Sequence, residues 1–527
     1  MTDEATTSDW DEECEVLVIG SGGGGLTGAY TAAALGLDTL VVEKTECYGG
    51  TTAYAGACLW LPGNPAQFRA GLEDSAELGR TYFRAVVGDS APAETQDAYI
   101  DHAGPTVAFL EKDPRIRFEH RPFPDYFEAP GRFPLGRGVF PVEYPAADAD
   151  DDLLRAVRPT AWEQRLGITG PQGPFTDGRA LIARLLAALR ATGRGQCLLR
   201  TALTRLVTGS DGAVLGAELS TADQGGALRV RAHAGVLLAA GGFEASHALR
   251  REWQGFHGAD WTMGAPGGNT GDAILAGRAI GADTALLGES WWCPSVLFPD
   301  GSANFALGFR GGIFVTGDGR RFANESLAYD RMGRAMLEAG AGDAPDRPVW
   351  WVFDGRWGEE PPGIVVVPPD RKSHAGAGLW HTADTLAELA AATGIDAGGL
   401  AETVHVFNGY ARDGVDADFH RGEDAYDTFF ADGKGPNPAL TPIEHGPFHA
   451  IRLVLGDLGT KGGLRTDPSA RVLRVDGSVI QGLYAAGNSM ASVAGPFYPG
   501  PGTPIGSAMV FGHLAARHMA GRSREAR

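Results

Sequence analysis

Apolar positions near the N-terminus form two short continuous runs with a helical stretch between them. Val16–Ile19 and Thr39–Val42 are dominated by aliphatic residues, a pattern typical of parallel strands buried on both faces. Leu26–Leu35 is rich in alanine, which favours a helix. The order of strand, helix and strand predicts a βαβ unit, the building block of an α/β fold with a parallel sheet.

Similar apolar segments follow further along the chain and are separated by turn signals. Leu181–Leu189 has the spacing of a helix with a buried face. Four later segments are predicted to be strands, joined by turns such as Ser210-Asp211-Gly212: Leu198–Val207, Val214–Leu219, Leu228–Ala232 and Gly235–Ala240.

The pattern changes between Gly288 and Gly446, where tryptophan and proline gather and the alternation of strands and helices weakens. Strand-like segments return at Val472–Val475 and Gly482–Ala485, and Ser507–Met519 fits a closing helix. We therefore predict one nucleotide-binding domain built from both ends of the chain, with a second, α+β domain inserted. The predicted boundaries are a disordered acidic tail at 1–12, the first part of the nucleotide-binding domain at 13–287, the insertion at 288–446, and the second part at 447–527.

Charge narrows the possible partners. The 45 Lys and Arg residues against 65 Asp and Glu residues give a formal net charge of −20, which opposes binding of nucleic acid or anionic lipid. No run of apolar residues is long enough to span a membrane, and the acidic N-terminus is unlike a signal peptide. We expect a cytoplasmic protein and a neutral or hydrophobic substrate.

The cysteines are widely spaced and lack metal-binding or haem-binding patterns. We therefore expect reduced thiols and no metal site. The five residues are Cys14, Cys47, Cys58, Cys197 and Cys293.

A glycine motif joins the first predicted strand to the first predicted helix. In Gly20-Ser21-Gly22-x-x-Gly25, the glycines allow a tight turn, close passage of a pyrophosphate, and close packing of the helix. The helix N-terminus offers free N–H groups to phosphate, and Glu43, after the second strand, can accept hydrogen bonds from a ribose. We predict a dinucleotide site; the alternative is a strand–turn–helix with a purely structural role.

A second loop follows soon after Glu43 and favours FAD over NAD. Gly49-Gly50-Thr51-Thr52 can continue along a ligand that is longer than the pyrophosphate, towards a flavin. Ala240-Gly241-Gly242 and Gly487-Asn488 supply further backbone that a ligand can approach closely. The absence of a second complete glycine motif argues against NAD(P)H as co-substrate.

Several motifs together resemble those of FAD-dependent 3-ketosteroid Δ1-dehydrogenases, within the fumarate reductase/succinate dehydrogenase flavoprotein superfamily. The resemblance covers nearly the whole chain and implies a Rossmann-type FAD-binding domain with an inserted α+β catalytic domain. The motifs are Glu43-Lys44, Gly49-Gly50-Thr51-Thr52, Gly241-Gly242-Phe243-Glu244, Asn269-Thr270-Gly271-Asp272, Gly459-Thr460-Lys461-Gly462-Gly463-Leu464 and Tyr498-Pro499-Gly500-Pro501-Gly502.

The resemblance also implies a reaction, the removal of hydrogen from C1 and C2 of ring A in a 3-oxosteroid. Tyr498 and the N–H of Gly502 match the pair that binds the C3 oxygen, Tyr329 matches the base, and Tyr126 matches the tyrosine that assists it. Each tyrosine could instead be a core residue with a satisfied hydroxyl. The residues predicted to bind FAD are Gly20, Ser21, Gly22, Gly25, Glu43, Lys44, Gly49, Gly50, Thr51, Thr52, Ala240, Gly241, Gly242, Asn269, Asp272, Gly487, Asn488 and Ile505.

Departures from related patterns keep some alternatives open. Gly459–Gly463 contains no histidine, and Asn488 stands where dicarboxylate enzymes of the superfamily usually have glutamate, which favours a neutral ketone. Pro499, Pro501 and Pro504 stiffen the C-terminal loop and leave the choice of steroid open. The alternatives are a 3-ketosteroid Δ4-(5α)-dehydrogenase, a reductase of activated alkenes, and a non-catalytic flavoprotein. The expected partner is an electron acceptor such as a quinone.

Overall fold

The computed structural model describes residues 10–145, 147, 151–165, 167–168, 173–222, 226–256, 258–344, 346–358 and 360–525. Most of the predicted acidic tail, residues 1–9, lies outside these described residues. The predicted C-terminal end of this tail, residue 12, is too late, because Glu12 is already the first residue of strand β1 (Glu12–Ile19) and pairs with Val230.

The predicted βαβ unit is present. Strand β1, helix α1 (Gly23–Ala34) and strand β2 (Thr39–Val42) follow one another, and the two strands pair in parallel, with Val16 opposite Thr39. The residues of β2 and those of β1 from Val16 to Ile19 are buried, as expected for strands covered on both faces. The predicted α/β fold class is confirmed.

The sheet around this unit has eight strands. Its main path runs β19–β20–β9–β1–β2–β6, and β7 and β8 extend it beside β9. The bounds of the further strands are β6 (Gly195–Leu198), β7 (Thr201–Thr208), β8 (Val214–Thr221), β9 (Gly226–Leu238), β19 (Arg471–Leu473) and β20 (Val479–Ala485).

Three of the predicted strands in this sheet have the wrong extent. The segment predicted as one strand at Leu198–Val207 is two strands, β6 and β7, because Arg200 between them has a φ of +52°, outside the range of a strand. The two strands predicted at Leu228–Ala232 and Gly235–Ala240 are one strand, β9, which pairs with β8 along its first half and with β1 along its second. Gly235, with a φ of +148°, lies where the predicted strands meet.

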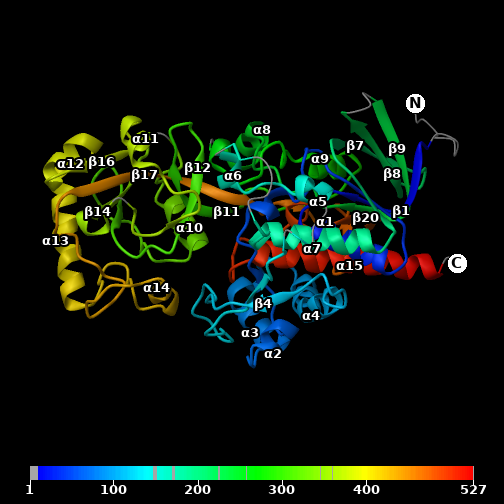
Figure 1. The fold of residues 1–527 in the computed structure, drawn as a ribbon, viewed down its shortest axis with the longest axis horizontal. Coiled ribbons are helices and arrows are strands. Elements are labelled where there is room, and N and C mark those ends of the chain that lie inside the picture. Colours follow the sequence, from blue (N-terminus) through cyan, green and yellow to red (C-terminus); the bar gives the residue numbers. More distant parts are fainter. Residues whose placement is uncertain are drawn as a thin grey trace. The chain divides into compact units, whose positions relative to one another are not determined.

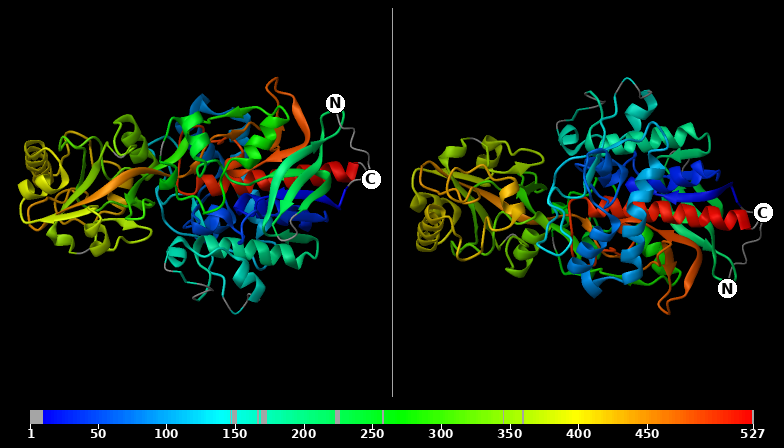
Figure 2. Two further views of the ribbon diagram at one scale, coloured as in Figure 1. Left: turned by 90° about the horizontal axis from the view of Figure 1, so that it is seen from above. Right: turned by 90° about the horizontal axis from the view of Figure 1, so that it is seen from below.

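Long helices pack beside α1. Helix α7 (Asp177–Ala191) and helix α15 (Thr503–Glu525) both contact it, and Figure 2 shows α15 in red along much of this part of the protein. The smaller elements of this part of the protein are η1 (Gly50–Tyr54), α5 (Asp151–Ala156), α6 (Ala161–Arg165), α8 (His247–Leu249), α9 (Asp272–Ala279), β10 (Thr284–Ala285), β18 (Gly463–Leu464) and η7 (Gly487–Ser489).

A second small layer is formed by residues 59–141 and appears at the bottom of Figure 1. Its three-stranded antiparallel sheet has the order β3–β5–β4, and helices surround it. Its elements are β3 (Leu59–Trp60), α2 (Pro65–Arg69), α3 (Ala76–Val87), η2 (Gly88–Ser90), α4 (Ala93–Leu110), β4 (Phe118–His120) and β5 (Gly138–Pro141).

The chain divides into two compact units. Unit 1 contains the described residues up to Leu249, Gly264–Glu289, and those from Thr460 onwards; unit 2 contains Arg250–Met263 and Ser290–Gly459. These bounds differ from the predicted insertion at 288–446 because strand β17 (Phe448–Thr460) pairs through its first half with strand β14 (Val349–Asp354) inside unit 2. The different roles predicted for the two domains stay predictions.

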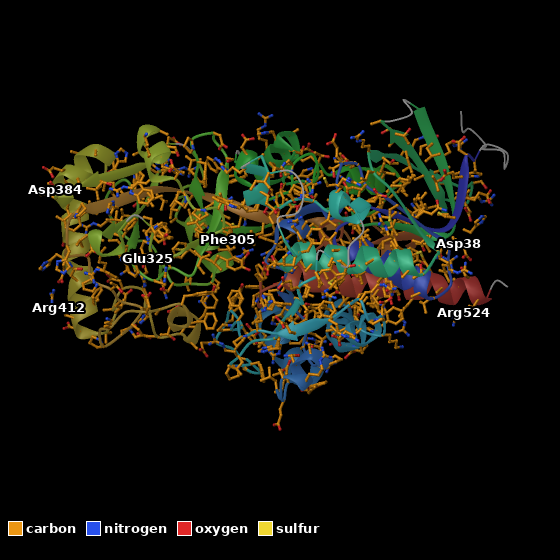
Figure 3. The ribbon with its side chains drawn as sticks, in the orientation of Figure 1. Asp38, Phe305, Glu325, Asp384, Arg412 and Arg524 are labelled. Atoms are coloured by element: carbon orange, nitrogen blue, oxygen red, sulfur yellow. The ribbon has the colours of Figure 1, made fainter. Side chains whose placement is uncertain are left out.

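Unit 2 is built on a seven-stranded sheet with the order β13–β14–β17–β11–β12–β15, to which β16 adds beside β17. Strand β17 is the long orange strand in Figure 1, and residues such as Phe305, Glu325 and Asp384 of this unit are labelled in Figure 3. The remaining elements are η4 (Arg250–Gln254), η5 (Ala259–Trp261), β11 (Ser290–Leu297), β12 (Ala303–Leu307), β13 (Ile313–Val315), α10 (Tyr329–Glu338), η6 (Gly355–Trp357), β15 (Ile364–Val365), α11 (Arg371–Gly376), β16 (Trp380–Ala383), α12 (Leu386–Thr393), α13 (Ala397–Asp413) and α14 (Ala425–Phe429).

Candidate functional site

The three motif glycines between β1 and α1 have different surroundings. A Cβ atom on Gly20, whose φ is +102°, would lie 2.3 Å from the carbonyl oxygen of Ala239, and a Cβ on Gly25 would lie 2.1 Å from that of Gly20. A Cβ on Gly22 would meet only Thr52 Oγ1, at 3.7 Å, within 4 Å among the described residues. Packing therefore requires the first and third glycines, whereas the second leaves an open face.

This open face lies at the N-terminus of α1. The N-cap residue, Gly22, has no side chain to cap the helix, and of the first N–H groups that of Gly23 donates a hydrogen bond to Thr52 Oγ1 at 3.1 Å. A helix N-terminus carries a positive partial charge and unpaired N–H groups, which bind phosphate well. The surroundings of Gly22 thus fit a pyrophosphate group that passes close to the backbone.

Glu43 is more fully engaged with the protein than its predicted role suggests. Its Oε2 accepts hydrogen bonds from Ser21 Oγ at 2.7 Å and from the Ser21 N–H at 3.3 Å. Its Oε1 accepts from the N–H of Thr45 at 3.0 Å and from Thr45 Oγ1 at 2.9 Å. Because a carboxylate has about four acceptor positions, a ribose hydroxyl would have to replace one of these donors.

The loop after β2 is tied to the segment before α9. Lys44 Nζ forms a 2.8 Å ion pair with Asp272 and donates to Thr270 Oγ1 at 2.6 Å. Thr51 Oγ1 accepts a hydrogen bond from Asn269 Nδ2 at 3.0 Å. Lys44 and Asp272, both predicted to bind the cofactor, therefore hold each other and join two parts of unit 1.

The other predicted cofactor residues gather at the same end of the sheet. Ser489 Oγ accepts a hydrogen bond from the Ala240 N–H at 3.0 Å and donates to the carbonyl of Gly241 at 2.9 Å, so it joins η7 to the end of β9. Ile505 lies against Gly23, since its Cγ2 would be 3.3 Å from a Cβ there. The remaining predicted cofactor residues lie in the segments that follow these strands: Gly49 and Gly50 at η1, Gly242 after β9, and Gly487 and Asn488 in η7.

The predicted pair of donors near the C-terminus is close together. The N–H of Gly502 donates a hydrogen bond to the hydroxyl oxygen of buried Tyr498, with 3.2 Å between the two atoms. Gly502 has a φ of +85°, and a Cβ on it would lie 1.9 Å from the carbonyl oxygen of Cys58. Only glycine fits this position, and one ketone oxygen could be reached by both groups.

Tyr126 lies beside Tyr498 in unit 1. The centroids of the two rings are 5.3 Å apart, with 64° between the ring planes. The N–H of Tyr126 also donates to the carbonyl oxygen of Pro499 at 3.0 Å. Three of the four predicted catalytic residues are thus neighbours.

A fully buried polar cluster that the sequence did not indicate supports these loops. Asp125 accepts hydrogen bonds from Trp60 Nε1 at 2.8 Å and from the Phe133 N–H at 3.2 Å, and it also contacts Arg137. Burial raises the pKa of Asp125, and the charge of Arg137 acts in the opposite direction. A Cβ on Gly500 would lie 2.4 Å from the Trp60 ring, so the cluster also sets the path of the C-terminal loop. The only sequence signal for Asp125 was its place next to Tyr126.

Tyr329, the fourth predicted catalytic residue, belongs to unit 2. It is buried at the start of α10, and its ring centroid is 4.8 Å from that of Phe305. Tyr329 therefore belongs to unit 2, whereas Tyr126, Tyr498 and Gly502 belong to unit 1.

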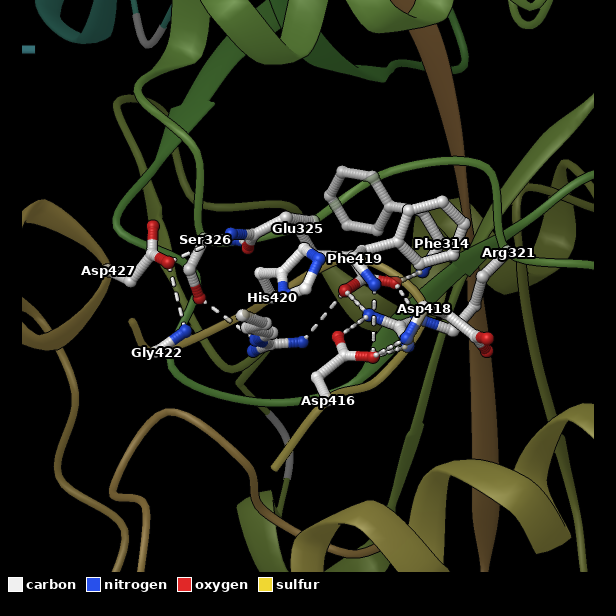
Figure 4. Close-up of polar contacts among 12 residues, drawn as sticks. Phe314, Arg321, Glu325, Ser326, Asp416, Asp418, Phe419, His420, Gly422 and Asp427 are labelled. Carbon is white, nitrogen blue, oxygen red and sulfur yellow. Dashed lines mark hydrogen bonds and ion pairs between the residues drawn. The ribbon is translucent and has the colours of Figure 1, made fainter. Parts of the chain in front are cut away.

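The segment before Tyr329 is anchored by buried ion pairs, shown in Figure 4. Arg321 donates to both oxygens of Glu325 at 2.8 Å, and Arg421 Nη1 donates to the same carboxylate at 3.1 Å. Arg321 also pairs with Asp416 at 2.8 Å. Burial acts to lower the pKa of Arg321, but Glu325 and Asp416 outweigh it and raise this pKa. The resemblance indicated Tyr329 but gave no role to Glu325.

Comparisons with known proteins show the family of this chain. A family model described as FAD binding domain matches residues 15–505. The chain is 43% identical to a 3-oxosteroid 1-dehydrogenase of Rhodococcus opacus, over 97% of this chain and 99% of that protein. It is 39% identical to a 3-oxosteroid 1-dehydrogenase of Mycolicibacterium smegmatis, over 97% of each chain. The chain belongs to the 3-oxosteroid 1-dehydrogenase family.

A solved structure extends the match to the fold of this family. It is a 3-ketosteroid Δ1-dehydrogenase from Sterolibacterium denitrificans in complex with 1,4-androstadiene-3,17-dione, with a TM-score of 0.87 and 33% identity, covering 97% of this chain and all of that one. Like other members of the 3-oxosteroid 1-dehydrogenase family, the protein is an FAD-dependent oxidoreductase, and the open face at Gly22 fits this cofactor.

No helix in the described part of the chain is long and apolar enough to cross a membrane. No group of three or more His, Cys, Asp or Glu residues in the described ranges is arranged to hold a metal ion.

Proposed function

We propose that the protein is an FAD-dependent 3-ketosteroid Δ1-dehydrogenase, which introduces a C1–C2 double bond into ring A of a 3-oxosteroid. The observation that carries this proposal is the pair formed by the Tyr498 hydroxyl and the Gly502 N–H, 3.2 Å apart in a buried loop. Two such donors suit a ketone oxygen, the group that a 3-oxosteroid presents.

The two donors make the first step of the reaction possible. A proton on the carbon next to a ketone is weakly acidic, because its loss places negative charge on the ketone oxygen. The Tyr498 hydroxyl and the Gly502 N–H, which would exchange its bond to Tyr498 for one to the substrate, would both donate to that oxygen as the charge develops. Fixed donors in a site that excludes water are worth about 3 kcal/mol each in comparable reactions.

We assign the base to Tyr329 and the assisting group to Tyr126. Free tyrosine titrates near pH 10 and is a weak base at neutral pH, so it needs a neighbour that stabilises its deprotonated form. The Tyr126 hydroxyl would provide that hydrogen bond, and Tyr329 would receive the C2 proton on its oxygen. The ion pairs that anchor the segment before Tyr329 support this assignment.

FAD, when bound, supplies the acceptor for the hydride that leaves C1, while the electrons of the C2–H bond form the new double bond. The residues that would hold it are the turn at Gly20–Gly25, the loop at Gly49–Thr52 and the backbone near Gly241 and Gly487. A quinone or similar molecule as the final electron acceptor, and a cytoplasmic location, remain predictions.

Product analysis tests the proposal and separates it from the alternatives. Purified protein loaded with FAD is mixed with 4-androstene-3,17-dione without oxygen, and flavin bleaching is followed. We expect bleaching and the formation of 1,4-androstadiene-3,17-dione. With 5α-androstane-3,17-dione, a Δ1-dehydrogenase forms the 1-ene and a Δ4-(5α)-dehydrogenase the 4-ene, which NMR distinguishes. Formation of the 4-ene, or flavin that stays oxidised with both steroids, would contradict the proposal.

A further inference from the structure

The hydroxyl of Tyr82 joins the backbone beside two of the proposed catalytic tyrosines. Tyr82 lies on α3 and is fully buried. Its hydroxyl donates a hydrogen bond to the carbonyl oxygen of Pro499 at 2.6 Å and accepts one from the N–H of Phe127 at 3.1 Å. Pro499 directly follows Tyr498, and Phe127 directly follows Tyr126.

The bridge is reinforced by a direct contact between the same two segments. The carbonyl oxygen of Pro499 also accepts the N–H of Tyr126 at 3.0 Å, so both of its acceptor positions are used. Burial raises the pKa of Tyr82, which keeps the hydroxyl protonated and able to donate. A tyrosine hydroxyl can give one hydrogen bond and accept others, and this one does both.

The ring of Tyr82 is itself fixed by its surroundings. Its centroid lies 6.1 Å from that of Trp60, and the guanidinium carbon of Arg137 is 5.4 Å from the ring centroid. Arg137 in turn pairs with Asp74 at 3.0 Å, and neither side chain is exposed. The hydroxyl of Tyr82 therefore has a defined position relative to both tyrosine segments.

We propose that Tyr82 is a positioning residue, whose hydroxyl sets the spacing between Tyr126 and Tyr498. This inference rests on the proposed function, because only then do both tyrosines act on one substrate. Reaction rates are sensitive to displacements of about 1 Å in the groups around a substrate. The two rings are 5.3 Å apart, so loss of the bridge lets one move against the other.

The test is the variant Tyr82→Phe, which removes one oxygen and keeps the ring that packs on Trp60 and Arg137. We expect kcat to fall about tenfold to a hundredfold, in the range of small misplacements, with KM and FAD content almost unchanged. With a steroid deuterated at C2, the isotope effect on kcat should increase because proton removal becomes slower. Hydrogen–deuterium exchange should become faster in residues 124–129 and 497–503.

Tyr484→Phe is the matched control. Tyr484 is also buried in unit 1, and its hydroxyl contacts His518 Nδ1 at 2.9 Å, away from both tyrosine segments. We expect this variant to lose a similar amount of thermal stability but to keep its kcat and its exchange rates at 124–129 and 497–503.

The possible outcomes are distinguishable. An unchanged kcat in Tyr82→Phe, an equal loss in both variants, or a loss fully explained by unfolding or lost FAD would overturn the positioning role. If the wild-type protein oxidises no 3-oxosteroid, the proposed function is wrong and the catalytic role of Tyr82 falls with it. The exchange measurement then still shows whether its hydroxyl joins the two segments.

Discussion

The main-chain N–H of Gly502 donates a hydrogen bond to the hydroxyl of Tyr498, with 3.2 Å between nitrogen and oxygen. The two groups are four residues apart in one turn, in which Gly502 has a φ of +85°. This relationship explains how a short segment could supply both donors to a substrate oxygen, and it makes the loop sensitive to small changes.

Removing the phenol oxygen should slow the reaction without preventing cofactor binding. We expect Tyr498→Phe to lower kcat by roughly 10² or more, as found when one oxyanion donor is lost, while the FAD spectrum stays unchanged. Steady-state kinetics with 4-androstene-3,17-dione checks this. A change confined to KM would mean that Tyr498 only helps to bind the steroid.

Replacing Gly502 with alanine should lower activity more than the positive φ of this position alone would, because the added methyl group has no space. A Cβ there would lie 1.9 Å from the carbonyl oxygen of Cys58. Gly477 is a matched control, since it has a φ of +83° and no atom of the described residues within 4 Å of its Cβ position. Gly477→Ala should cost about 1 kcal/mol of stability and keep activity. Gly502→Ala should lower kcat at least tenfold; equal activity in the two variants would contradict the role of this turn.

Loss of the proposed base should abolish turnover and spare the cofactor. We expect Tyr329→Phe to retain FAD and lose nearly all dehydrogenation, because no other group is assigned to take the C2 proton. The control is Tyr410→Phe. Tyr410 is a half-buried residue of α13 in the same unit, and this variant should behave like the wild type. Anaerobic flavin reduction measures the step directly, and rapid bleaching in Tyr329→Phe would reject the assignment.

The ion pairs around Glu325 should matter for the stability of unit 2. Glu325→Gln leaves Arg321 and Arg421 with an uncompensated buried charge, so we expect a loss of about 3–5 kcal/mol in the free energy of unfolding. Arg320 and Glu402 form a comparable pair at 3.1 Å, with 52% and 62% of their side chains exposed. Glu402→Gln should therefore cost under about 1 kcal/mol. Denaturant titrations of the two variants compare them, and equal losses would show that burial of the first pair is unimportant.

The open face at Gly22 predicts a variant that folds but binds FAD poorly. Gly22 has φ −70° and ψ 179°, which alanine adopts without strain, and its Cβ would meet only Thr52 among the described residues. We expect Gly22→Ala to weaken FAD binding at least tenfold, about 1.4 kcal/mol, with no change in the melting temperature of the apoprotein. Gly376→Ala, on exposed α11, is the control. Flavin fluorescence titration measures both, and unchanged affinity would argue against close approach of the cofactor there.

Local patterns predicted the nucleotide-binding half well where one element follows the next. Strand β2 has the predicted bounds, β1 and α15 contain the predicted segments, and α1 contains all of its predicted segment except Leu35, because apolar runs and helix-forming residues encode these elements directly. The predictions were wrong where the extent of a strand depends on the strands with which it pairs. Arg200 divides one predicted strand, and β9 continues through Gly235 because it pairs with β8 and then with β1.

The amino-acid sequence by itself determined the class of fold, the glycine turn, and the short motifs that carry Tyr126, Tyr329, Tyr498 and Gly502. Only the tertiary structure decided which groups hold those residues in place. The hydroxyl of Tyr82 reaches the carbonyl of Pro499 across 417 positions of the chain. Hydrophobic patterns and secondary-structure propensities depend on residues that are close along the chain. A hydrogen bond of this kind depends on how distant segments pack, so local sequence patterns do not predict it.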